Sequence, residues 1–326
     1  MNTVLITGVS GQDAYYLNKL KLAAGFRVIG VTHNTAAINA LIHQRSFDIA
    51  DVVTWDFLDQ ARISSIIAEY RPVEIYNFAA LASGSGMYDN PVGISEINGL
   101  SVIRILQAIR EIDPSIRFCQ ASSSEMFGDV LESPQTENTP LRPRSPYGAA
   151  KAFAHEMVGI YRKYYGLFAC SAILYNHESP IRGLGFVSRK ITHTAAKIKL
   201  GLENKLGLGN LDALRDWGFA GDYVNAMSLM LESEIADDYV VSSGEVHSVR
   251  DLCECAFGHL GLNYKQYVYQ DPSFYRSESS IQLVGCTDKV RRVLGWERTC
   301  DFRSMICTMV DRDLESVARC IQPNNL

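Results

Sequence analysis

The chain has 326 residues, which is room for two domains of about 150 residues each and for a large apolar core. Its formal net charge is −5 at pH 7, and acidic and basic residues are mixed along the sequence. This balance does not indicate a nucleic-acid or membrane surface, so neither kind of partner is expected.

The eight cysteines show no paired metal-ligand spacing, so we expect no metal site and free thiols in a reducing cytosol. The first residues enter a strand pattern without a basic region or a cleavage site, and no apolar run approaches membrane-spanning length. The expectation is a cytoplasmic protein.

The first half of the chain alternates strand-like and helix-like patterns. Apolar runs typical of buried strands lie at 3–7, 27–31, 52–55, 73–78, 117–121 and 169–174. Helical spacing of apolar residues lies between them, at 13–24, 58–70, 94–112 and 147–164. This alternation is typical of right-handed crossovers, and it predicts an α/β fold with a Rossmann-type, doubly wound parallel sheet.

The second half breaks the alternation. We expect turns at 176–185, a helix from Ser188, a short strand at 205–208 and a loop at 210–221. A strand at 239–241 should return to the main sheet, followed by a helix capped by Ser248 and an amphipathic helix at 302–318. The predicted domains are a dinucleotide-binding domain, 1–175 with 218–245 returning to it, and a smaller mixed α/β substrate-binding lobe, 176–217 and 246–326.

A glycine motif lies at the turn from the first strand to the first helix. Gly8, Gly11 and Ala14 are spaced three apart. The first glycine permits the tight turn, the second lets a pyrophosphate approach the backbone, and the small third residue lets helix and strand pack closely. The motif predicts dinucleotide binding at the helix N-terminus, where free amides favour negative charge.

The ends of the next two strands bear on the choice of cofactor. An acidic residue after the second strand would bind ribose hydroxyls and a basic one the extra phosphate of NADP, but this chain has His33 and Asn34. Either these two residues donate to a phosphate or they belong to a polar loop. Asp56, after the third strand, either reaches adenine or caps the following helix.

Candidate catalytic residues follow the fifth strand and begin the helix at 147–164. Tyr147 and Lys151 are four residues apart and share a helix face, where the ammonium can lower the pKa of the phenol and make it a general base. Ser123 can hydrogen-bond a sugar hydroxyl, and Glu125 supplies a carboxyl that can take a proton from carbon and deliver one to a leaving hydroxyl.

Several longer motifs support a more specific interpretation. They include Gln120-Ala121-Ser122-Ser123-Ser124-Glu125, Asn176-His177-Glu178-Ser179-Pro180, Arg215-Asp216-Trp217-Gly218 and Leu294-Gly295-Trp296. In these motifs, and over most of its length, the chain resembles the GDP-mannose 4,6-dehydratases of the extended short-chain dehydrogenase/reductase superfamily.

This resemblance implies an NAD(P)-dependent hydro-lyase. The enzyme would convert GDP-mannose or a related GDP-hexose to the 4-keto-6-deoxy sugar nucleotide, by internal hydride transfer and loss of water. Tyr147 would be the base, and Lys151 would hold the phenolate and the nicotinamide ribose. Glu125 would be the acid/base for elimination, and Ser123 stands where the family usually has threonine.

The binding residues follow from the glycine motif and the resemblance together. Those expected at the cofactor are Gly8, Ser10, Gly11, Gln12, Asp13, His33, Asn34, Asp56, Phe57, Ala79, Ala80, Tyr147, Lys151, His177 and Arg182. Those expected at the substrate are Ser124, Asn176, Lys190, Arg215 and Arg276. The cations among the second group suit a doubly charged pyrophosphate.

Departures from the family's pattern leave some alternatives open. The family usually has paired arginines where this chain has His33 and Asn34, so the resemblance implies NADP while NAD remains an alternative. An expected Gln-Ser-His run is replaced by Leu81-Ala82-Ser83, and a tyrosine near Gly93 is missing, so the hexose stays open. The loop after Asn34, which builds tetramers in the family, is shorter here. A homodimer through the helices that contain Ile94 and Tyr147, or a homotetramer, is expected.

Two other functions compete with dehydration. A 4-reductase or epimerase of a nucleotide keto-sugar would keep Tyr147 and Lys151 but would not require Glu125. A non-catalytic cofactor-binding regulator would fit the altered loops, but the presence of Ser123, Glu125, Tyr147 and Lys151 argues against it.

Overall fold

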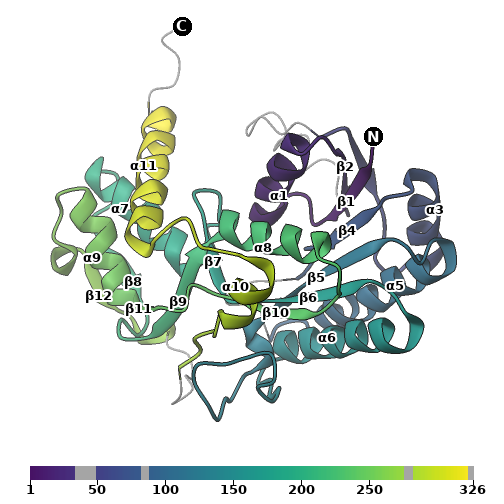
Figure 1. The fold of residues 1–326 in the computed structure, drawn as a ribbon. Helices are drawn as coiled ribbons and strands as arrows, with labels where there is room; N and C mark the ends of the chain where they lie inside the picture. The colour runs from purple at the N-terminus through teal and green to yellow at the C-terminus, as the bar shows by residue number, and fades with distance from the viewer. Residues whose placement is uncertain (34–48, 82–87, 275–281, 322–326) are drawn as a thin grey trace, which may run out of the picture.

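A seven-stranded parallel sheet forms the centre of the computed structural model, which describes residues 1–33, 49–81, 88–274 and 282–321 (Figure 1). The strand order is β10-β6-β5-β4-β1-β2-β3, and all neighbours in this order are parallel. The strands are β1 (Thr3–Thr7), β2 (Arg27–Thr32), β3 (Asp51–Thr54), β4 (Glu74–Asn77), β5 (Arg117–Ser123), β6 (Ala169–Leu174) and β10 (Asp238–Val241). The chain order reverses between β1 and β4, so the predicted Rossmann-type sheet is confirmed.

Helices cover both faces of this sheet (Figure 1). One layer contains α1 (Gln12–Ala23), α8 (Ala220–Glu232) and α10 (Asp288–Leu294), and the other contains α3 (Gln60–Tyr70), α5 (Ser101–Ile112) and α6 (Pro146–Tyr165). All five residues of β1 and all six of β6 are buried. A parallel sheet covered on both faces needs such continuous apolar strands, which is why the sequence pattern found them.

Helix α6 has clear start and stop signals. The Ser145 hydroxyl oxygen accepts a hydrogen bond from the Gly148 amide at 3.0 Å, and Pro146 occupies the first turn. The helix ends at Gly166, whose φ of 70° is the left-handed conformation that favours glycine. These signals fix the start of the helix on which Tyr147 and Lys151 lie.

One segment corrects an expectation about membranes. Residues 91–112, which contain α4 (Pro91–Ser95), a π-helical turn (Glu96–Leu100) and α5, are long and apolar enough to cross a membrane by length and composition. Half of this stretch is buried inside the structure, and a core helix of a soluble protein passes the same test. Its apolar side chains form part of the core against α3 and α6.

A second lobe, predicted to bind substrate and called the substrate lobe for that reason, lies beside the sheet and has its own core (Figure 1). It contains a three-stranded sheet in the order β11-β9-β7 and a two-stranded sheet of β12 and β8. The strands are β7 (Asn176–Glu178), β8 (Leu206–Leu208), β9 (Leu214–Phe219), β11 (Val246–Ser248) and β12 (Val268–Gln270). Helices α7 (Val187–Lys199), α9 (Val249–His259) and α11 (Phe302–Ile321) pack together there. The exact domain division remains a prediction.

Two expectations for the second half were wrong. The predicted loop at 210–221 contains β9 and the start of α8, and the turn-rich segment at 176–185 begins with β7. β7 and β9 pair with each other across about forty residues of chain, so their neighbours in sequence carry no sign of the pairing. The expected cap is confirmed, because Ser248 and Asp251 form a capping box at α9.

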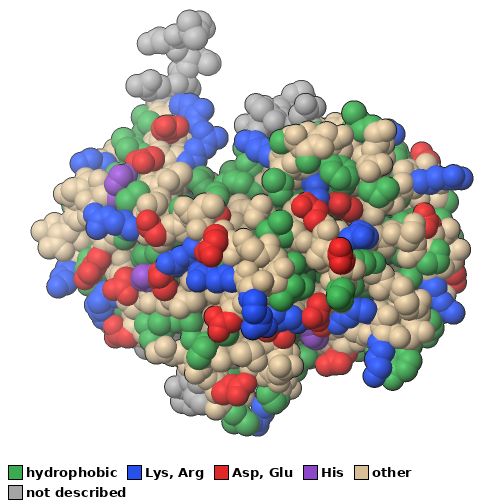
Figure 2. Space-filling view, viewed as in Figure 1, with side chains coloured by type: hydrophobic (Ala, Val, Ile, Leu, Met, Phe, Trp, Pro, Cys, Tyr) green, Lys and Arg blue, Asp and Glu red, His purple; other side chains and the backbone are tan. Residues whose placement is uncertain are grey.

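Acidic and basic side chains are interspersed over both parts of the molecule on the face shown in Figure 2. This distribution agrees with the mixed charge along the sequence.

Candidate active site

The predicted catalytic residues meet at the carboxyl end of β5. Ser123 is the last residue of that strand, and a short 3-10 turn, Ser124–Met126, follows it. The Glu125 amide donates to the Ser123 hydroxyl oxygen at 3.2 Å, and Ser123 hydrogen-bonds the Tyr147 phenol. A Cβ on Gly148 would lie 2.5 Å from the Glu125 carbonyl oxygen, so the first turn of α6 packs directly on this turn. The structure therefore brings Ser123, Glu125 and Tyr147 together.

Lys151 lies one helical turn after Tyr147 and is almost fully buried. Its ammonium donates to the Ala121 carbonyl oxygen at 2.7 Å, and its Nζ atom is 5.9 Å from the centroid of the Tyr147 ring. Burial lowers the pKa of Lys151 to about 8, and the negative charge of Asp13 partly opposes this shift. Lys151 is thus held against β5 by a backbone contact and titrates close to neutral pH.

The expected lowering of the phenol pKa was wrong. Burial raises the pKa of Tyr147 to about 12, and the Ser123 hydrogen bond and the Arg182 charge only partly oppose it. Loss of water around the phenol outweighs these effects, and the Lys151 ammonium is turned toward the Ala121 carbonyl. Tyr147 is therefore a phenol at neutral pH in this structure.

The glycine turn fits a dinucleotide. Gly8 has a φ of 65°, and a Cβ there would lie 2.8 Å from the Ala79 backbone nitrogen. Gly11 is the N-cap of α1, and no side chain caps that helix, so its first amides are available to a pyrophosphate. Ser10 is exposed beside them, and Ala79 and Ala80 follow β4 at the same edge. The turn has the backbone geometry that the glycine motif predicts, and cofactor binding by these residues stays a prediction.

Gln12 and Asp13 join this turn to β7. The side-chain nitrogen of Gln12 donates to the His177 carbonyl oxygen at 2.8 Å, and its side-chain oxygen accepts from the Ser179 hydroxyl at 2.8 Å. The Asp13 carboxylate lies 3.1 Å from Nε2 of His177, while Nδ1 of that ring lies 2.7 Å from the Tyr175 carbonyl oxygen. Both ring nitrogens of His177 therefore contact protein acceptors, and one face of its ring stacks on Tyr223 at 4.8 Å.

Arg182 lies near the pair of His177 and Asp13. The Glu178 carboxylate and the Phe186 ring hold its side chain in place. Its Nε is 3.3 Å from the Glu178 carboxylate, and its guanidinium lies 3.6 Å above the Phe186 ring. The Ser188 hydroxyl donates to the same Glu178 oxygen at 2.5 Å. The charge of Arg182 lowers the pKa of both Asp13 and Tyr147, which places it within electrostatic reach of the phenol.

The adenosine end of the cofactor site is less defined. His33 is exposed at the end of β2, and Asn34 lies outside the described residues. Asp56 is exposed, and its carboxylate accepts from the Leu58 amide at 2.8 Å, so it stabilises the turn before α3. Phe57 is buried and packs edge-on against Trp55 at 5.6 Å. An adenine contact by Asp56 or Phe57 stays a prediction.

The described substrate candidates lie on four different elements: the turn after β5, β7, α7 and β9. Ser124 is buried beside Glu125, and Asn176 begins β7. In the lobe, the Lys190 ammonium donates to the Gly207 carbonyl oxygen at 2.8 Å and lies 3.8 Å over the Phe274 ring. Arg215 is on β9, and Arg276 lies outside the described residues. Their roles at the diphosphate stay predictions.

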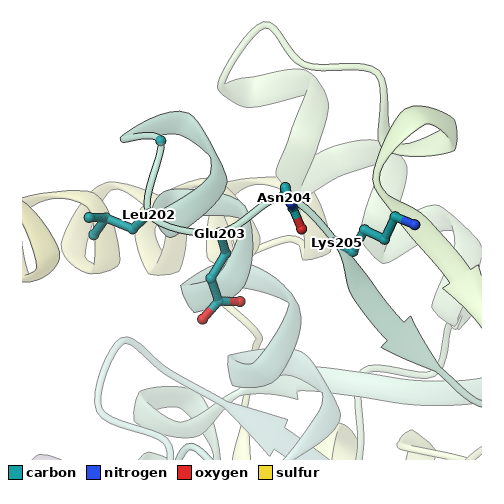
Figure 3. Close-up of a pocket in the computed structure, with 5 residues that line it drawn as sticks. Leu202, Glu203, Asn204 and Lys205 are labelled. Carbon is teal, nitrogen blue, oxygen red and sulfur yellow. The ribbon is translucent and has the colours of Figure 1, made fainter.

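A surface hollow elsewhere in the lobe is not this site. It has a volume of about 350 Å³ and is lined by Gly201, Leu202, Glu203, Asn204 and Lys205 (Figure 3). These residues follow one another in a single turn after α7, and their side chains diverge from it. No convergent set of polar groups is formed by these five residues.

The sequence did not reveal the residues that hold the site residues in place. Glu178 was named only as part of a motif, although its buried carboxylate pairs with Arg182. Arg189 and Asp313 were given no role, and they lie 124 residues apart in the chain. A charged residue on the buried face of α11 was the available signal for Asp313.

Comparisons with known proteins agree with this geometry. The sequence profile described as GDP-mannose 4,6 dehydratase matches residues 5–309. GDP-mannose 4,6 dehydratase 2 of Arabidopsis thaliana is 43% identical over 327 residues, which cover 97% of this chain and 87% of that protein.

Two solved structures share the fold. RMD from Pseudomonas aeruginosa, complexed with NADPH, has a TM-score of 0.83 at 22% identity and covers 97% of this chain and 100% of its own. The dTDP-glucose 4,6-dehydratase from Bacillus anthracis, in complex with NAD, has a TM-score of 0.82 at 19% identity and covers 98% of both chains. The profile match and the identity to the Arabidopsis protein show that this chain belongs to the GDP-mannose 4,6-dehydratase family.

Proposed function

We propose that this chain removes water from GDP-mannose, or from a related GDP-hexose, to give the 4-keto-6-deoxy sugar nucleotide. Membership of the family supports the reaction type. The observation that carries the proposal is the position of Glu125, whose turn is packed against the first turn of α6 beside Ser123 and Tyr147. A reductase or epimerase needs a hydroxyl and a phenol there, but it has no use for this carboxyl.

Ser123, Tyr147 and Lys151 serve the first step. The Ser123 hydroxyl and the Tyr147 phenol share a hydrogen bond, so Ser123 can hydrogen-bond a sugar hydroxyl while Tyr147, as the phenolate, takes its proton. The Lys151 ammonium, buried and fixed to the Ala121 carbonyl oxygen, favours the phenolate that forms when Tyr147 gives up its own proton. A nicotinamide cofactor, when bound, accepts a hydride from carbon 4 of the sugar and returns it to carbon 6.

Glu125 serves the elimination. A ketone at carbon 4 acidifies the hydrogen on carbon 5, so a carboxylate of moderate basicity is sufficient to remove it. The same carboxyl then protonates the hydroxyl that leaves carbon 6 as water. Glu125 is partly buried at the carboxyl edge of the sheet, where ligands bind in folds of this kind.

For the cofactor we propose NADP, with weak discrimination against NAD. The related structures contain NADPH and NAD, which supports a nicotinamide cofactor without deciding between them. His33, exposed at the end of β2, offers a ring nitrogen to an extra phosphate but lacks the fixed charge of an arginine. Mass spectrometry of the cofactor released from the denatured protein tests this choice.

We propose a cytoplasmic location, which is in keeping with the eight unpaired cysteines. We further propose a homodimer formed through α4 to α6. Large apolar side chains are exposed on these helices, namely Val92, Leu100, Phe153, Ile160 and Tyr164. The three on α6 recur at helical spacing and share a face, and the Phe153 ring packs close to Gly99 in the neighbouring helix. A second copy of the chain would cover this continuous apolar face.

Incubation with a panel of nucleotide sugars tests the proposed reaction. The product should be lighter than the substrate by one water, and GDP-mannose should be among the substrates. Deuterium placed at carbon 4 should appear at carbon 6 of the product without exchange with solvent. A product of unchanged mass would instead support an epimerase, and a deuterium label lost to water would contradict internal hydride transfer.

A further inference from the structure

A polar row of three side chains crosses the central sheet near its carboxyl edge. Its members, Thr7 on β1, Asn77 on β4 and Gln120 on β5, are directly paired in the register of neighbouring strands. All three are 0% exposed. The residues two positions earlier on these strands belong to the core beneath α3, α5 and α6, namely Leu5, Ile75 and Phe118. Side chains two apart on a strand point to the same face, so the polar row faces the helix layer that contains α6.

Hydrogen bonds join the polar row from end to end. The Ala79 backbone amide donates to the Thr7 hydroxyl oxygen at 3.0 Å, and that hydroxyl donates to Oδ1 of Asn77 at 2.5 Å. Nδ2 of Asn77 donates to Oε1 of Gln120 at 2.8 Å, and Nε2 of Gln120 donates to the Ala121 carbonyl oxygen at 2.9 Å. The bonds therefore run from one backbone amide to one backbone carbonyl.

The two ends of the polar row lie at the glycine turn and at Lys151. A Cβ on Gly8 would lie 2.8 Å from the Ala79 backbone nitrogen, so the first end is in close contact with that turn. At the other end, the Lys151 ammonium donates to the same Ala121 carbonyl oxygen at 2.7 Å. Because Gln120 and Lys151 share this acceptor, the Gln120 amide group is a neighbour of the ammonium.

The two backbone groups set the direction of every bond between them. A backbone amide can only donate, and a backbone carbonyl can only accept. The Thr7 oxygen accepts from Ala79, so its own proton goes to Asn77, and each side-chain amide then offers its nitrogen to the next acceptor. The row is closed to water, so a reversed amide would face a like group with no other partner.

This fixed direction decides what the Lys151 ammonium meets. An ammonium has three protons, and among the described residues the Ala121 oxygen is its hydrogen-bond acceptor. The Gln120 amide turns its nitrogen to this side and offers no second acceptor. The remaining protons of Lys151 are therefore free for the Tyr147 phenolate, whose ring centroid lies 5.9 Å from Nζ.

We propose that Thr7, Asn77 and Gln120 are positioning residues, which keep a hydrogen-bond donor turned toward Lys151 and leave its ammonium available to the catalytic group. This inference rests on the proposed function, in which Lys151 favours the phenolate of Tyr147. Strands that are buried on both faces are usually apolar throughout, so the sheet by itself does not require three linked polar side chains.

Gln120→Glu tests the direction of the polar row. Glutamate has nearly the same shape and still accepts from Asn77, but it offers Lys151 an acceptor in place of a donor. The ammonium should then be held more tightly, and the pKa of Lys151 should rise from about 8 by about 1–3 pH units. The pH at which kcat/KM levels off should rise with it, because the plateau begins where the ammonium is lost. Gln266→Glu, an exposed change that adds the same charge, should alter neither value.

Thr7→Val and Thr7→Ser test the far end of the polar row. Valine removes the hydroxyl, so nothing fixes the Asn77 amide, and the Gln120 amide can reverse and turn its oxygen to Lys151. The pKa of Lys151 should rise by less than in Gln120→Glu, and kcat should fall about 10- to 100-fold with a smaller change in KM. Serine keeps the hydroxyl and should restore the values of the unaltered chain.

The titration of Lys151 is measured in the free protein, by NMR of chains labelled with carbon-13 at the lysine ε carbon. Lys151→Arg identifies its signal. The titratable groups around Lys151 are Tyr147 on its own helix and Asp13 on α1, and Glu125 acts on Tyr147 from the turn after β5. These three groups are unaltered in every variant of the polar row, so a shift reports on the row.

Two results would overturn the inference. One is a lower melting temperature of Thr7→Val with an unchanged titration of Lys151, which would reduce the polar row to a structural contact. The other is an unchanged titration in Gln120→Glu, and if that variant does not fold, the comparison of Thr7→Val with Thr7→Ser decides the question. The NMR titration needs no substrate, so failure of the unaltered chain to dehydrate any nucleotide sugar would remove the proposed function and leave this measurement in force.

Discussion

Nε2 of His177 lies 3.1 Å from the Asp13 carboxylate, and Nδ1 of the same ring lies 2.7 Å from the Tyr175 carbonyl oxygen. Both partners are acceptors, and the Asp13 charge outweighs burial, so the pKa of His177 lies above its ordinary value. The first turn of α1, where the cofactor phosphates would bind, is joined to β7 of the substrate lobe through this pair. A cofactor contact by His177 stays a prediction.

This pair predicts a pH-dependent contribution to stability. Burial disfavours the charged ring, but Asp13 outweighs it and raises the pKa of His177 above its ordinary value of 6.5. A raised pKa contributes stability that is fully present below 6.5 and is lost as the pH rises through the raised value. His177→Gln should therefore cost on the order of 3 kcal/mol at acidic pH, and the cost should shrink at alkaline pH.

Thermal unfolding of both proteins followed by circular dichroism from pH 5 to 9 measures this difference. His259→Gln is the control, since His259 forms an exposed pair with Asp311. A cost that does not depend on pH would show that His177 is neutral in the folded chain.

Glu125→Gln should abolish dehydration and leave cofactor binding intact. The amide cannot accept the carbon 5 proton, so turnover should fall about 10²- to 10⁴-fold. Reduced nicotinamide should accumulate during the first turnover, because oxidation at carbon 4 does not need Glu125. Absorbance at the reduced-nicotinamide band and product mass report the two steps. Glu297→Gln, an exposed change elsewhere, serves for comparison, and normal product formation by Glu125→Gln would remove its assigned role.

The pH dependence of kcat/KM should rise up to about pH 8 and then level off. Activity needs the Tyr147 phenolate and the Lys151 ammonium together, and their pKa values are about 12 and about 8. Below pH 8 each step in pH forms more phenolate. Above it, the gain in phenolate is matched by loss of the ammonium, so the product of the two fractions stays constant.

Lys151→Arg should separate these two groups. A guanidinium stays charged, so the rate of that variant should continue to rise above pH 8. Tyr147→Phe should show no first hydride transfer at any pH, whereas Tyr164→Phe, at the exposed end of the same helix, should behave like the unaltered chain. A pH profile of Lys151→Arg that also levels off near pH 8 would assign the plateau to another group.

The start of α6 should not tolerate a side chain at Gly148. An added Cβ would meet the Glu125 carbonyl oxygen at 2.5 Å, a contact with backbone that cannot yield without moving α6. Gly148→Ala should cost about 1–3 kcal/mol and should lower activity more than stability alone explains. Gly159→Ala, on the same helix with its nearest neighbour 3.9 Å away, should instead stabilise by about 0.5–1 kcal/mol. Chemical denaturation of both variants checks the contrast, and equal effects would contradict it.

The exposed face of α4 to α6 should control assembly. Leu100→Glu and Ile160→Glu each place a charge in the apolar face and should shift the protein toward the monomer. Leu202→Glu, at an exposed position of the substrate lobe, should not change the assembly. Analytical ultracentrifugation distinguishes the species. A dimer that persists in both Leu100→Glu and Ile160→Glu would place the interface elsewhere.

Much of the sheet could be predicted because its strands are buried on both faces. The strand at 169–174 and the helix at 147–164 were apparent from local sequence alone, since apolar runs and helical spacing have local causes. β7 and β9 were not apparent, because short strands depend on partners far away in the chain. The candidate catalytic residues were proposed from their place after the fifth strand and from the Tyr147/Lys151 spacing, but the pKa of Tyr147 was predicted in the wrong direction, because desolvation depends on all that surrounds the ring.

The sequence by itself determined the fold class and the glycine turn, and it singled out Ser123, Glu125, Tyr147 and Lys151 as catalytic candidates, because each inference rests on residue type and local spacing. The tertiary structure alone decided that Lys151 bonds the Ala121 carbonyl oxygen, that Asp13 raises the pKa of His177 and that Asp313 holds Arg189. These contacts join segments 30, 164 and 124 residues apart, and their energies depend on burial, which no local pattern reports.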